Sequence, residues 1–334
     1  MVDQHDATVS GAHAAKSRAP WVKIVRAAIG LGLLLTLLLW NDNAAKLLGV
    51  ARDFEPKYLV ALFLIAFGLN ALSSLKWSLF VRERGFDISQ VQLFNLYLIG
   101  KFFSNFLPSM VGGDLARIYL LGRAISSHSR SFASVFLERA TGVVGLTLLT
   151  ILFGLLNPEM LTNPFIALSI AAAAMACAIA VVLFYRPSLL FRICGPVADV
   201  PLLGKVVSKG ERVIREVTYF RHHQRLLLLS MLYSLGFHLL AGVNVYVACL
   251  SIGLVPPLLD ILVLTPVILL LVMIPVSPNN IGWWEWCFSV LLIEAGATAV
   301  EGLVVALVLR AVTMAMSVIG GLLFLQYRLG HATS

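Results

Sequence analysis

The sequence predicts an all-α polytopic membrane protein, and two observations lead to that prediction. Hydrophobic residues make up 59% of the 334 residues and charged residues only 13%, which is about half the charged share of a soluble domain. The apolar residues also fall in long runs, as helices that cross a hydrocarbon core of about 30 Å require. Because these runs are continuous rather than alternating, they do not fit a membrane β-barrel.

Six of the runs have the length of one membrane-spanning helix. They are Ile24–Trp40, Tyr58–Phe80, Phe132–Leu156, Phe165–Tyr185, Leu226–Leu250 and Leu303–Leu325. The first run is long for a signal-peptide core and no clear cleavage site follows it, so it is interpreted as an uncleaved span. Residues 1–20 are small and polar and are predicted to form a disordered cytoplasmic tail.

Two further apolar segments, Ile88–Leu121 and Leu258–Ile293, are interrupted by Pro, Gly and polar residues. Each is too short for two passes, which need about 40 apolar residues and a turn, and too long for one pass. Lipid-exposed backbone does not tolerate such breaks, because freed N–H and C=O groups find no water in hydrocarbon. Each segment is therefore predicted to be a re-entrant helical hairpin that enters and leaves the membrane on one side.

The distribution of Lys and Arg predicts the orientation. Basic residues precede the first span, flank the first broken segment, follow the last span, and number eight in the connection 186–225. The loops 157–164 and 251–257 contain no Lys or Arg. The positive-inside rule then places both termini in the cytoplasm. Loop 41–57 fits least well, because it must lie outside and yet carries three basic residues against three acidic ones.

The predicted order of elements repeats in the two halves of the chain. Residues 21–160 and 161–330 each supply three spans and one hairpin, and the hairpins enter from opposite sides. Pro108 and Gly112 have the same spacing as Pro278 and Gly282. These features predict two inverted repeats with a site between them at mid-depth. The second repeat includes a basic amphipathic linker at about 186–225, which fits either the cytoplasmic leaflet or packing on cytoplasmic loops.

Charge and cysteine usage narrow the class of function. The net charge of +8 lies in short loops, so it indicates orientation and attraction to anionic lipid rather than nucleic-acid binding. The four cysteines have no CxxC spacing, and neither a disulfide nor a metal site is predicted. No cofactor is expected, since the chain has no GxSxG, HExxH or Walker motif.

The two breaks supply most of the candidate site. A helix that restarts after Gly112-Gly113, or after Asn279-Asn280, presents its first N–H groups to an anion. Ionisable residues inside a membrane are costly and therefore suggest function. The candidate substrate-binding residues are Asn105, Pro108, Gly112, Gly113, Asp114, Arg117, Pro278, Asn279, Asn280, Gly282, Glu285, Arg310 and Arg139, with Asp114 and Glu285 as candidate proton carriers. Asp114 also fits a helix cap. The tryptophans beside Glu285, which are Trp283, Trp284 and Trp286, fit an interfacial belt.

The segment from Gly100 to Arg117, GKFFSNFLPSMVGGDLAR, resembles the first signature of the lysylphosphatidylglycerol synthase transmembrane-domain family, also called flippase-like. The segment from Pro275 to Glu285, PVSPNNIGWWE, resembles its looser second signature. The resemblance covers nearly the whole chain after residue 20 and identifies it as a stand-alone member without the aminoacyl-transferase domain. It implies a two-repeat helical fold with re-entrant hairpins and, in founding members, movement of an aminoacylated phospholipid between leaflets.

The leading hypothesis is an inner-membrane flippase for an anionic-headgroup lipid, either a phospholipid or a polyprenyl-phosphate-linked lipid. One alternative is a glycosyltransferase or other lipid-carrier transferase that uses the external acidic pair Asp53 and Glu55. Another is a non-catalytic membrane subunit of a lipid or glycan synthase. The expected partners are the lipid substrate and the bilayer, and a synthase, a transferase or a second copy of the chain remain open alternatives.

Overall fold

The computed structural model describes residues 20–39, 49–50, 52–106, 112–186 and 213–332, and no β-strand occurs among them. Before the connection 186–225 lie helices α1 (Pro20–Leu39), α3 (Lys57–Arg82), α4 (Gln90–Phe106), α5 (Gly112–Ala124), α6 (His128–Leu156) and α7 (Pro164–Tyr185). The helices that start at its end or after it are α10 (Gln224–Leu250), α11 (Leu258–Val272), α12 (Trp283–Leu291) and α13 (Ala299–Ala332). Short 3-10 turns are η2 (Pro158–Thr162), η3 (Tyr219–His222), η4 (Pro278–Asn280) and η5 (Leu292–Ala295).

Among the described residues, five helices are long and apolar enough to cross a membrane, and they coincide with five of the predicted spans. They cover Lys57–Arg82, His128–Leu156, Pro164–Tyr185, Gln224–Leu250 and Ala299–Tyr327. The first predicted span, Ile24–Trp40, appears as α1, which runs from Pro20 to Leu39. The prediction of a multi-pass, all-α membrane protein is therefore confirmed.

The outer surface of the helices is apolar, as contact with lipid requires. Helix α7 shows this most clearly, since Leu168, Met175 and Ile179 are all more than half exposed. A soluble protein rarely exposes such contiguous apolar area. A helix that is apolar all round and exposed at the edge of a bundle is suited to face hydrocarbon.

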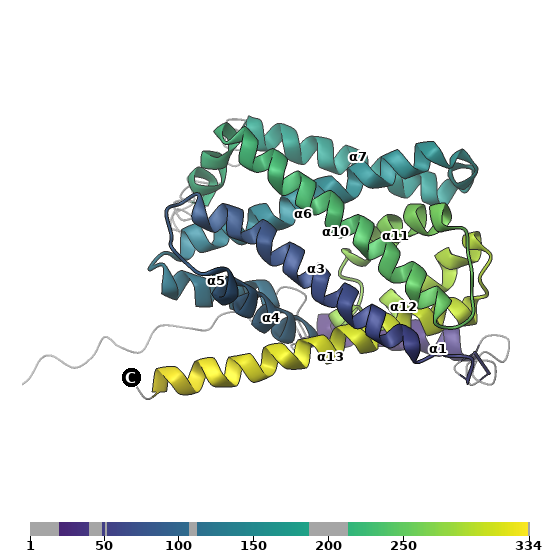
Figure 1. Cartoon of the computed structure of the whole chain (residues 1–334). Helices are drawn as coiled ribbons and strands as arrows, with labels where there is room; N and C mark the ends of the chain where they lie inside the picture. Colours follow the sequence, from purple (N-terminus) through teal and green to yellow (C-terminus); the bar gives the residue numbers. More distant parts are fainter. Residues whose placement is uncertain (1–19, 40–48, 51, 107–111, 187–212, 333–334) are drawn as a thin grey trace, which may run out of the picture.

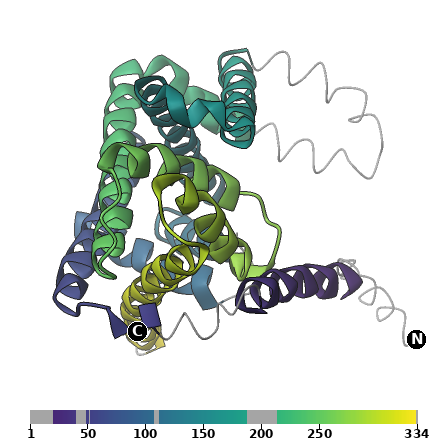
Figure 2. The same ribbon diagram turned by 90° about the vertical axis from the view of Figure 1, so that its right-hand side faces the viewer.

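Each predicted hairpin is a pair of short helices that occupies one half of the bundle length. Figure 1 shows α4 and α5 towards the end that also holds the C-terminus, with α11 and α12 towards the other end. Helix α1 contacts α12 and η4, and Figure 2 shows it at the edge of the bundle in purple. The paired short helices thus approach mid-length from opposite ends.

Polar contacts sort the helix ends into two groups. The starts of α4, α6 and α10 lie at what we call the basic end, where Glu216 forms ion pairs with Arg84 and Arg130 and where His223 lies 3.2 Å from Glu83. The starts of α3, α7, α11 and α13 lie at the opposite, acidic end. There the Asn157 amide donates to Asp260 at 2.7 Å and the Asn163 amide to Glu294 at 2.9 Å.

The described part of the linker packs on the bundle. Residues 213–218 are helical and lead into η3. Val217 and Phe220 are buried against Phe80 and Leu137, and the rings of Phe80 and Phe220 meet edge to face with centroids 5.5 Å apart. Residues 187–212 lie outside the described part, so the alternative of a leaflet-bound helix stays a prediction for that stretch.

Candidate functional site

The two breaks touch each other. The side-chain amide of Asn279, in the second break, donates to the backbone carbonyl of Asn105 at the end of α4 across 2.8 Å. The Asn105 amide in turn donates to the carbonyl of Thr313 on α13 at 3.4 Å. Residues that the sequence places in different halves are therefore brought to one region. Pro108 lies outside the described residues.

The second break is built from residues that tolerate left-handed backbone. Asn279 and Asn280 have φ values of 52° and 53°, and Gly282 has a φ of 84°. Asparagine and glycine adopt this region with less strain than other residues. The Asn280 amide also donates to the carbonyl of Val272 at 2.7 Å, which satisfies one of the carbonyls left open at the end of α11. Pro278 begins the short turn η4.

Helix α1 presses directly on this second break. A Cβ added to Gly282 would lie 2.0 Å from the carbonyl oxygen of Gly30. A Cβ added to Gly30 would lie 2.5 Å from the carbonyl oxygen of Ile281. Both positions need glycine, because the two backbones approach more closely than any side chain allows.

The first break leads into a group of charged residues that we call the α5–α6 cluster: Lys76, Asp114, Arg117, Glu138 and Arg139. Arg117 is 2% exposed and pairs with Asp114 at 2.6 Å and with Glu138 at 3.1 Å. Lys76 lies 3.4 Å from the other Glu138 oxygen. A buried side chain stays ionised only when an opposite charge and hydrogen bonds offset its loss of hydration, as the ion pairs here do.

Arg139 is the member of the cluster that faces outward. Its side chain is 50% exposed, yet its guanidinium donates to Asp114 at 2.9 Å. Arg117, by contrast, is held between two rings, with its guanidinium carbon 5.0 Å from the Trp77 centroid and 4.8 Å from that of Tyr97. Three basic and two acidic groups leave the cluster with a formal charge of about +1 when all are ionised. Of the two arginines that pair with Asp114, Arg139 is therefore the accessible one and Arg117 the buried one.

Close backbone packing makes room for Arg117. A Cβ on Gly113 would lie 2.1 Å from the carbonyl oxygen of Gly100, and a Cβ on Gly100 would lie 2.6 Å from Cγ of Arg117. Helix α5 begins at Gly112, so both glycines lie in its first turn, and the expectation that the helix restarts after them is wrong. They serve to bring α4 and α5 together.

The second break has its own ion pair. Glu285 is buried and accepts from Arg310 at 2.5 Å and from the backbone N–H of Gly282 at 2.7 Å. Arg310 also donates to the carbonyl of Asn280 at 3.1 Å. Sequence reasoning expected the first N–H groups here to face an anionic substrate. Glu285 instead fills that place at Gly282, as an acidic residue in the first helical turn commonly does.

The two ion pairs occupy matching positions in their elements. Asp114 is the third residue of α5 and Glu285 the third residue of α12. Their partners, Arg139 and Arg310, are each the twelfth residue of the following long helix, α6 or α13. The pairs differ in access: Asp114 and Arg139 have side-chain exposures of 20% and 50%, against 2% and 18% for Glu285 and Arg310.

Lys76 and Glu138 belong to the cluster although neither is among the residues predicted from the sequence. Both are charges inside predicted apolar spans, and that signal was sufficient to include them. Reasoning also favoured an interfacial belt for the tryptophans near the second break. Trp283 and Trp284 instead donate to the carbonyls of Leu271 and Ala306, at 2.9 and 3.2 Å, and so join α12 to α11 and α13.

The acidic pair of the transferase alternative lies on the surface of the acidic end. Asp53 and Glu55 are both exposed. The Glu55 carboxylate forms an ion pair with Lys57, and its backbone N–H donates to the carbonyl of Ser251 at 2.8 Å. Glu55 thus has a structural part in joining the start of α3 to the end of α10.

Comparison with known proteins identifies the family of the chain. The family model for the lysylphosphatidylglycerol synthase TM region matches residues 23–321. Two relatives are named UPF0104 membrane proteins. The one from Methanothermobacter thermautotrophicus is 32% identical over 26% of this chain and 27% of the relative. The one from Methanocaldococcus jannaschii is 28% identical over 28% of this chain and 29% of the relative. The match thus spans less than a third of each relative's length. No solved structure matches the chain significantly. The chain belongs to the family of the lysylphosphatidylglycerol synthase TM region.

Proposed function

We propose that the protein moves an anionic-headgroup lipid, either a phospholipid or a polyprenyl-phosphate-linked lipid, between the two leaflets of a membrane. The observation that carries this proposal is the matched placement of Asp114–Arg139 and Glu285–Arg310 beside two breaks that touch each other. Arginine forms strong, oriented hydrogen bonds with phosphate as well as with carboxylate. Two such arginines at mid-length offer a phosphate a polar path through an apolar bundle.

Asp114 acts in this proposal as a placeholder for the lipid phosphate. It accepts from both Arg139 and Arg117, as a phosphate oxygen could. Because Arg139 is half exposed, the phosphate of an arriving headgroup can pair with Arg139 in place of Asp114, while Glu138 keeps Arg117 in position. The more buried Glu285–Arg310 pair would receive the phosphate when that side opens.

The same exchange suggests how protons could be coupled to transport. A buried carboxylate that loses its arginine is costly to keep ionised, so it tends to become neutral by protonation. Glu285 is buried and would meet this condition when a phosphate occupies Arg310. Asp114 is partly exposed and keeps Arg117, and its protonation would instead follow from the repulsion between its carboxylate and a phosphate bound at Arg139. They are the proposed proton carriers, and each returns its proton when the lipid leaves.

The matched ion pairs also support the inverted-repeat arrangement that we propose for this site. Each repeat contributes one acidic residue from its second short helix and one arginine from its next long helix. With the basic end facing the cytoplasm, both termini lie inside, as the positive-inside rule favours. The proposed location is the inner membrane of a bacterium or archaeon.

The test is lipid movement in proteoliposomes that contain the purified full chain and fluorescent anionic or zwitterionic lipids. We expect the wild type to move the anionic lipid, and Arg310→Gln to slow it at least tenfold. Arg130→Gln is the control, because Arg130 lies at the basic end and pairs with Glu216 outside the site. If no lipid class moves in wild-type vesicles, the proposal is wrong.

The two alternative functions predict different results, which can be measured with variants of the protein and in a strain from which its gene is deleted. A transferase that uses Asp53 and Glu55 would lose its product in Asp53→Ala, while Arg139→Gln and Arg310→Gln would retain it. A synthase subunit would restore a deletion strain only when its partner enzyme is present.

A further inference from the structure

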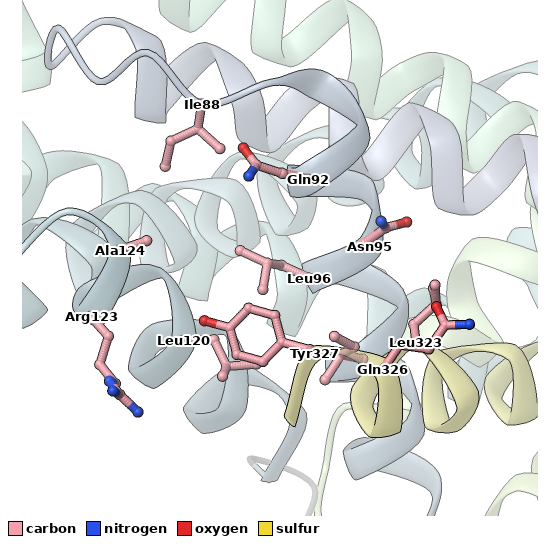
Figure 3. Close-up of a pocket in the computed structure, with 11 residues that line it drawn as sticks. Ile88, Gln92, Asn95, Leu96, Leu120, Arg123, Ala124, Leu323, Gln326 and Tyr327 are labelled. Carbon is pink, nitrogen blue, oxygen red and sulfur yellow. The ribbon is translucent and has the colours of Figure 1, made fainter. Parts of the chain in front are cut away.

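A cavity of about 500 Å³ lies at the basic end, between the two short helices α4 and α5 and the last turns of α13. Its floor is apolar and buried, formed by Leu96, Ile99 and Leu120. Figure 3 shows the ring of Tyr327 between this floor and α13, beside Leu120. The cavity therefore brings both helices of the first broken segment and the C-terminal span to one surface.

The rim of the cavity is polar, in contrast to its floor. Gln92 on α4, Arg123 on α5 and Gln326 on α13 line it, and all three are exposed. Arg123 is the charged residue among the lining side chains. A pocket with an apolar floor and a rim of hydrogen-bond donors with one cation fits an amphiphile that carries a negative headgroup.

The depth of the cavity fits a lipid at the membrane surface. In the sequence, the apolar run of α13 gives way to Gln326, Tyr327 and Arg328, and tyrosine is enriched where hydrocarbon gives way to headgroups. A lipid lying there would keep its headgroup near Arg123 and place the upper part of a chain against Leu96 and Leu120. This position is open to lipids of the leaflet at the basic end.

The floor of the cavity adjoins the α5–α6 cluster. Ile99 precedes Gly100, the residue against which the side chain of Arg117 packs. Leu120 follows Arg117 by three residues and so lies on the same side of α5. From Arg123 at the rim to Asp114 is nine residues along this helix, or about 13 Å.

We propose that this cavity is the loading site, where an anionic lipid from the basic-end leaflet binds before its headgroup reaches Arg139. This inference rests on the proposed function, because it assigns the step that precedes exchange with Asp114. The lipid enters with its headgroup at Arg123, and its chain follows the apolar floor. Arg123 at the rim favours a negatively charged headgroup before that headgroup reaches Arg139.

Photo-crosslinking tests the loading site independently of transport. The purified chain is placed in vesicles of a zwitterionic lipid with a trace of phosphatidylglycerol that carries a diazirine in one acyl chain. After illumination, mass spectrometry locates the adducts. We expect them to concentrate on peptides that contain Leu96, Leu120 and Leu323, and to be competed by unlabelled phosphatidylglycerol but not by glycerol phosphate in solution.

Two pairs of variants sharpen the result. Leu120→Trp fills the floor and should reduce adducts there at least fivefold, whereas Leu115→Trp adds the same ring on the exposed side of α5 and should not. Arg123→Gln should remove the preference for anionic over zwitterionic probe, whereas Arg82→Gln, at the same end but outside the lining, should keep it.

The outcomes separate the two proposals. Adducts spread evenly over the lipid-facing helices, or adducts unchanged in Leu120→Trp, would overturn the loading site even if the protein moves lipid. Competition by glycerol phosphate would also overturn it, since the ligand would then be a free anion. Concentrated adducts in a protein that moves no lipid would uphold the cavity as a lipid site and refute transport.

Discussion

Asn279 donates its side-chain amide to the backbone carbonyl of Asn105 across 2.8 Å, although 174 positions separate them in the chain. This contact joins the second break to the end of α4 near the middle of the bundle. Any movement of one short-helix pair against the other must stretch or break it. The contact is therefore a sensitive point for both stability and transport.

Removing this amide should weaken the junction without disturbing the backbone. Asn279→Gly retains the left-handed φ and deletes the donor. Loss of one hydrogen bond costs about 1 kcal/mol, so we expect Tm in detergent to fall by about 1–2 °C and lipid movement to slow. Asn70→Ala is the control, because its amide bonds to Ala66 within one helix. A larger effect of the control on lipid movement would contradict this account.

The two acids of the α5–α6 cluster should behave differently. Glu138→Gln leaves Lys76 and Arg117 buried without a full counter-charge, and breaking such a pair costs about 3–5 kcal/mol. Asp114→Asn affects a partly exposed acid whose partner Arg139 can reach solvent. Thermal melts should therefore show much lower stability for Glu138→Gln, whereas Asp114→Asn should stay folded and alter lipid movement. The reverse order of stabilities would show that Asp114 is the structural acid.

Two glycines with the same backbone angle separate strain from steric clash. Gly282 and Gly296 both have a φ of 84°, but a Cβ at Gly282 would strike Gly30 and one at Gly296 meets open space. Gly296→Ala should cost only the left-handed strain of about 1 kcal/mol. Gly282→Ala should cost clearly more in unfolding experiments, because α1 must move away. Equal costs would mean that α1 does not press on the break.

Orientation can be tested by labelling single cysteines in a background without native cysteines. Ser89→Cys places a thiol at the basic end and Thr162→Cys one at the acidic end, and both positions are exposed. An impermeant maleimide should label Thr162→Cys in intact cells and Ser89→Cys only after the membrane is opened. The opposite pattern would reverse the proposed topology.

Hydropathy predicted the long spans well, because the period and length of apolar runs depend only on local sequence. It also located both breaks, because proline and glycine interrupt the helix, and an interrupted backbone is tolerated at membrane depth only where the protein shields it from lipid. The ends of α5 were placed less well. Gly112 and Gly113 look like a boundary in sequence, but their function is close contact with α4 through Gly100, which only the folded arrangement reveals.

The charge partners were harder to predict than the charged residues themselves. Arg117 pairs locally with Asp114, and Glu138 and Lys76 complete its surroundings from other helices. Glu285 was expected to face a substrate, whereas its carboxylate caps its own helix and holds Arg310. Which arginine pairs with which acid depends on how the helices are rotated about their axes, and spacing in the sequence does not determine that rotation.

The most direct test of the central claim is the ratio of translocation rates for anionic and zwitterionic lipids in the same proteoliposomes. The wild type should move the anionic lipid at least tenfold faster. Arg139→Gln should abolish that preference, because the headgroup then loses the exposed arginine that releases Asp114. Equal rates for both lipids in the wild type, or an unchanged preference in Arg139→Gln, would contradict transport through this arginine.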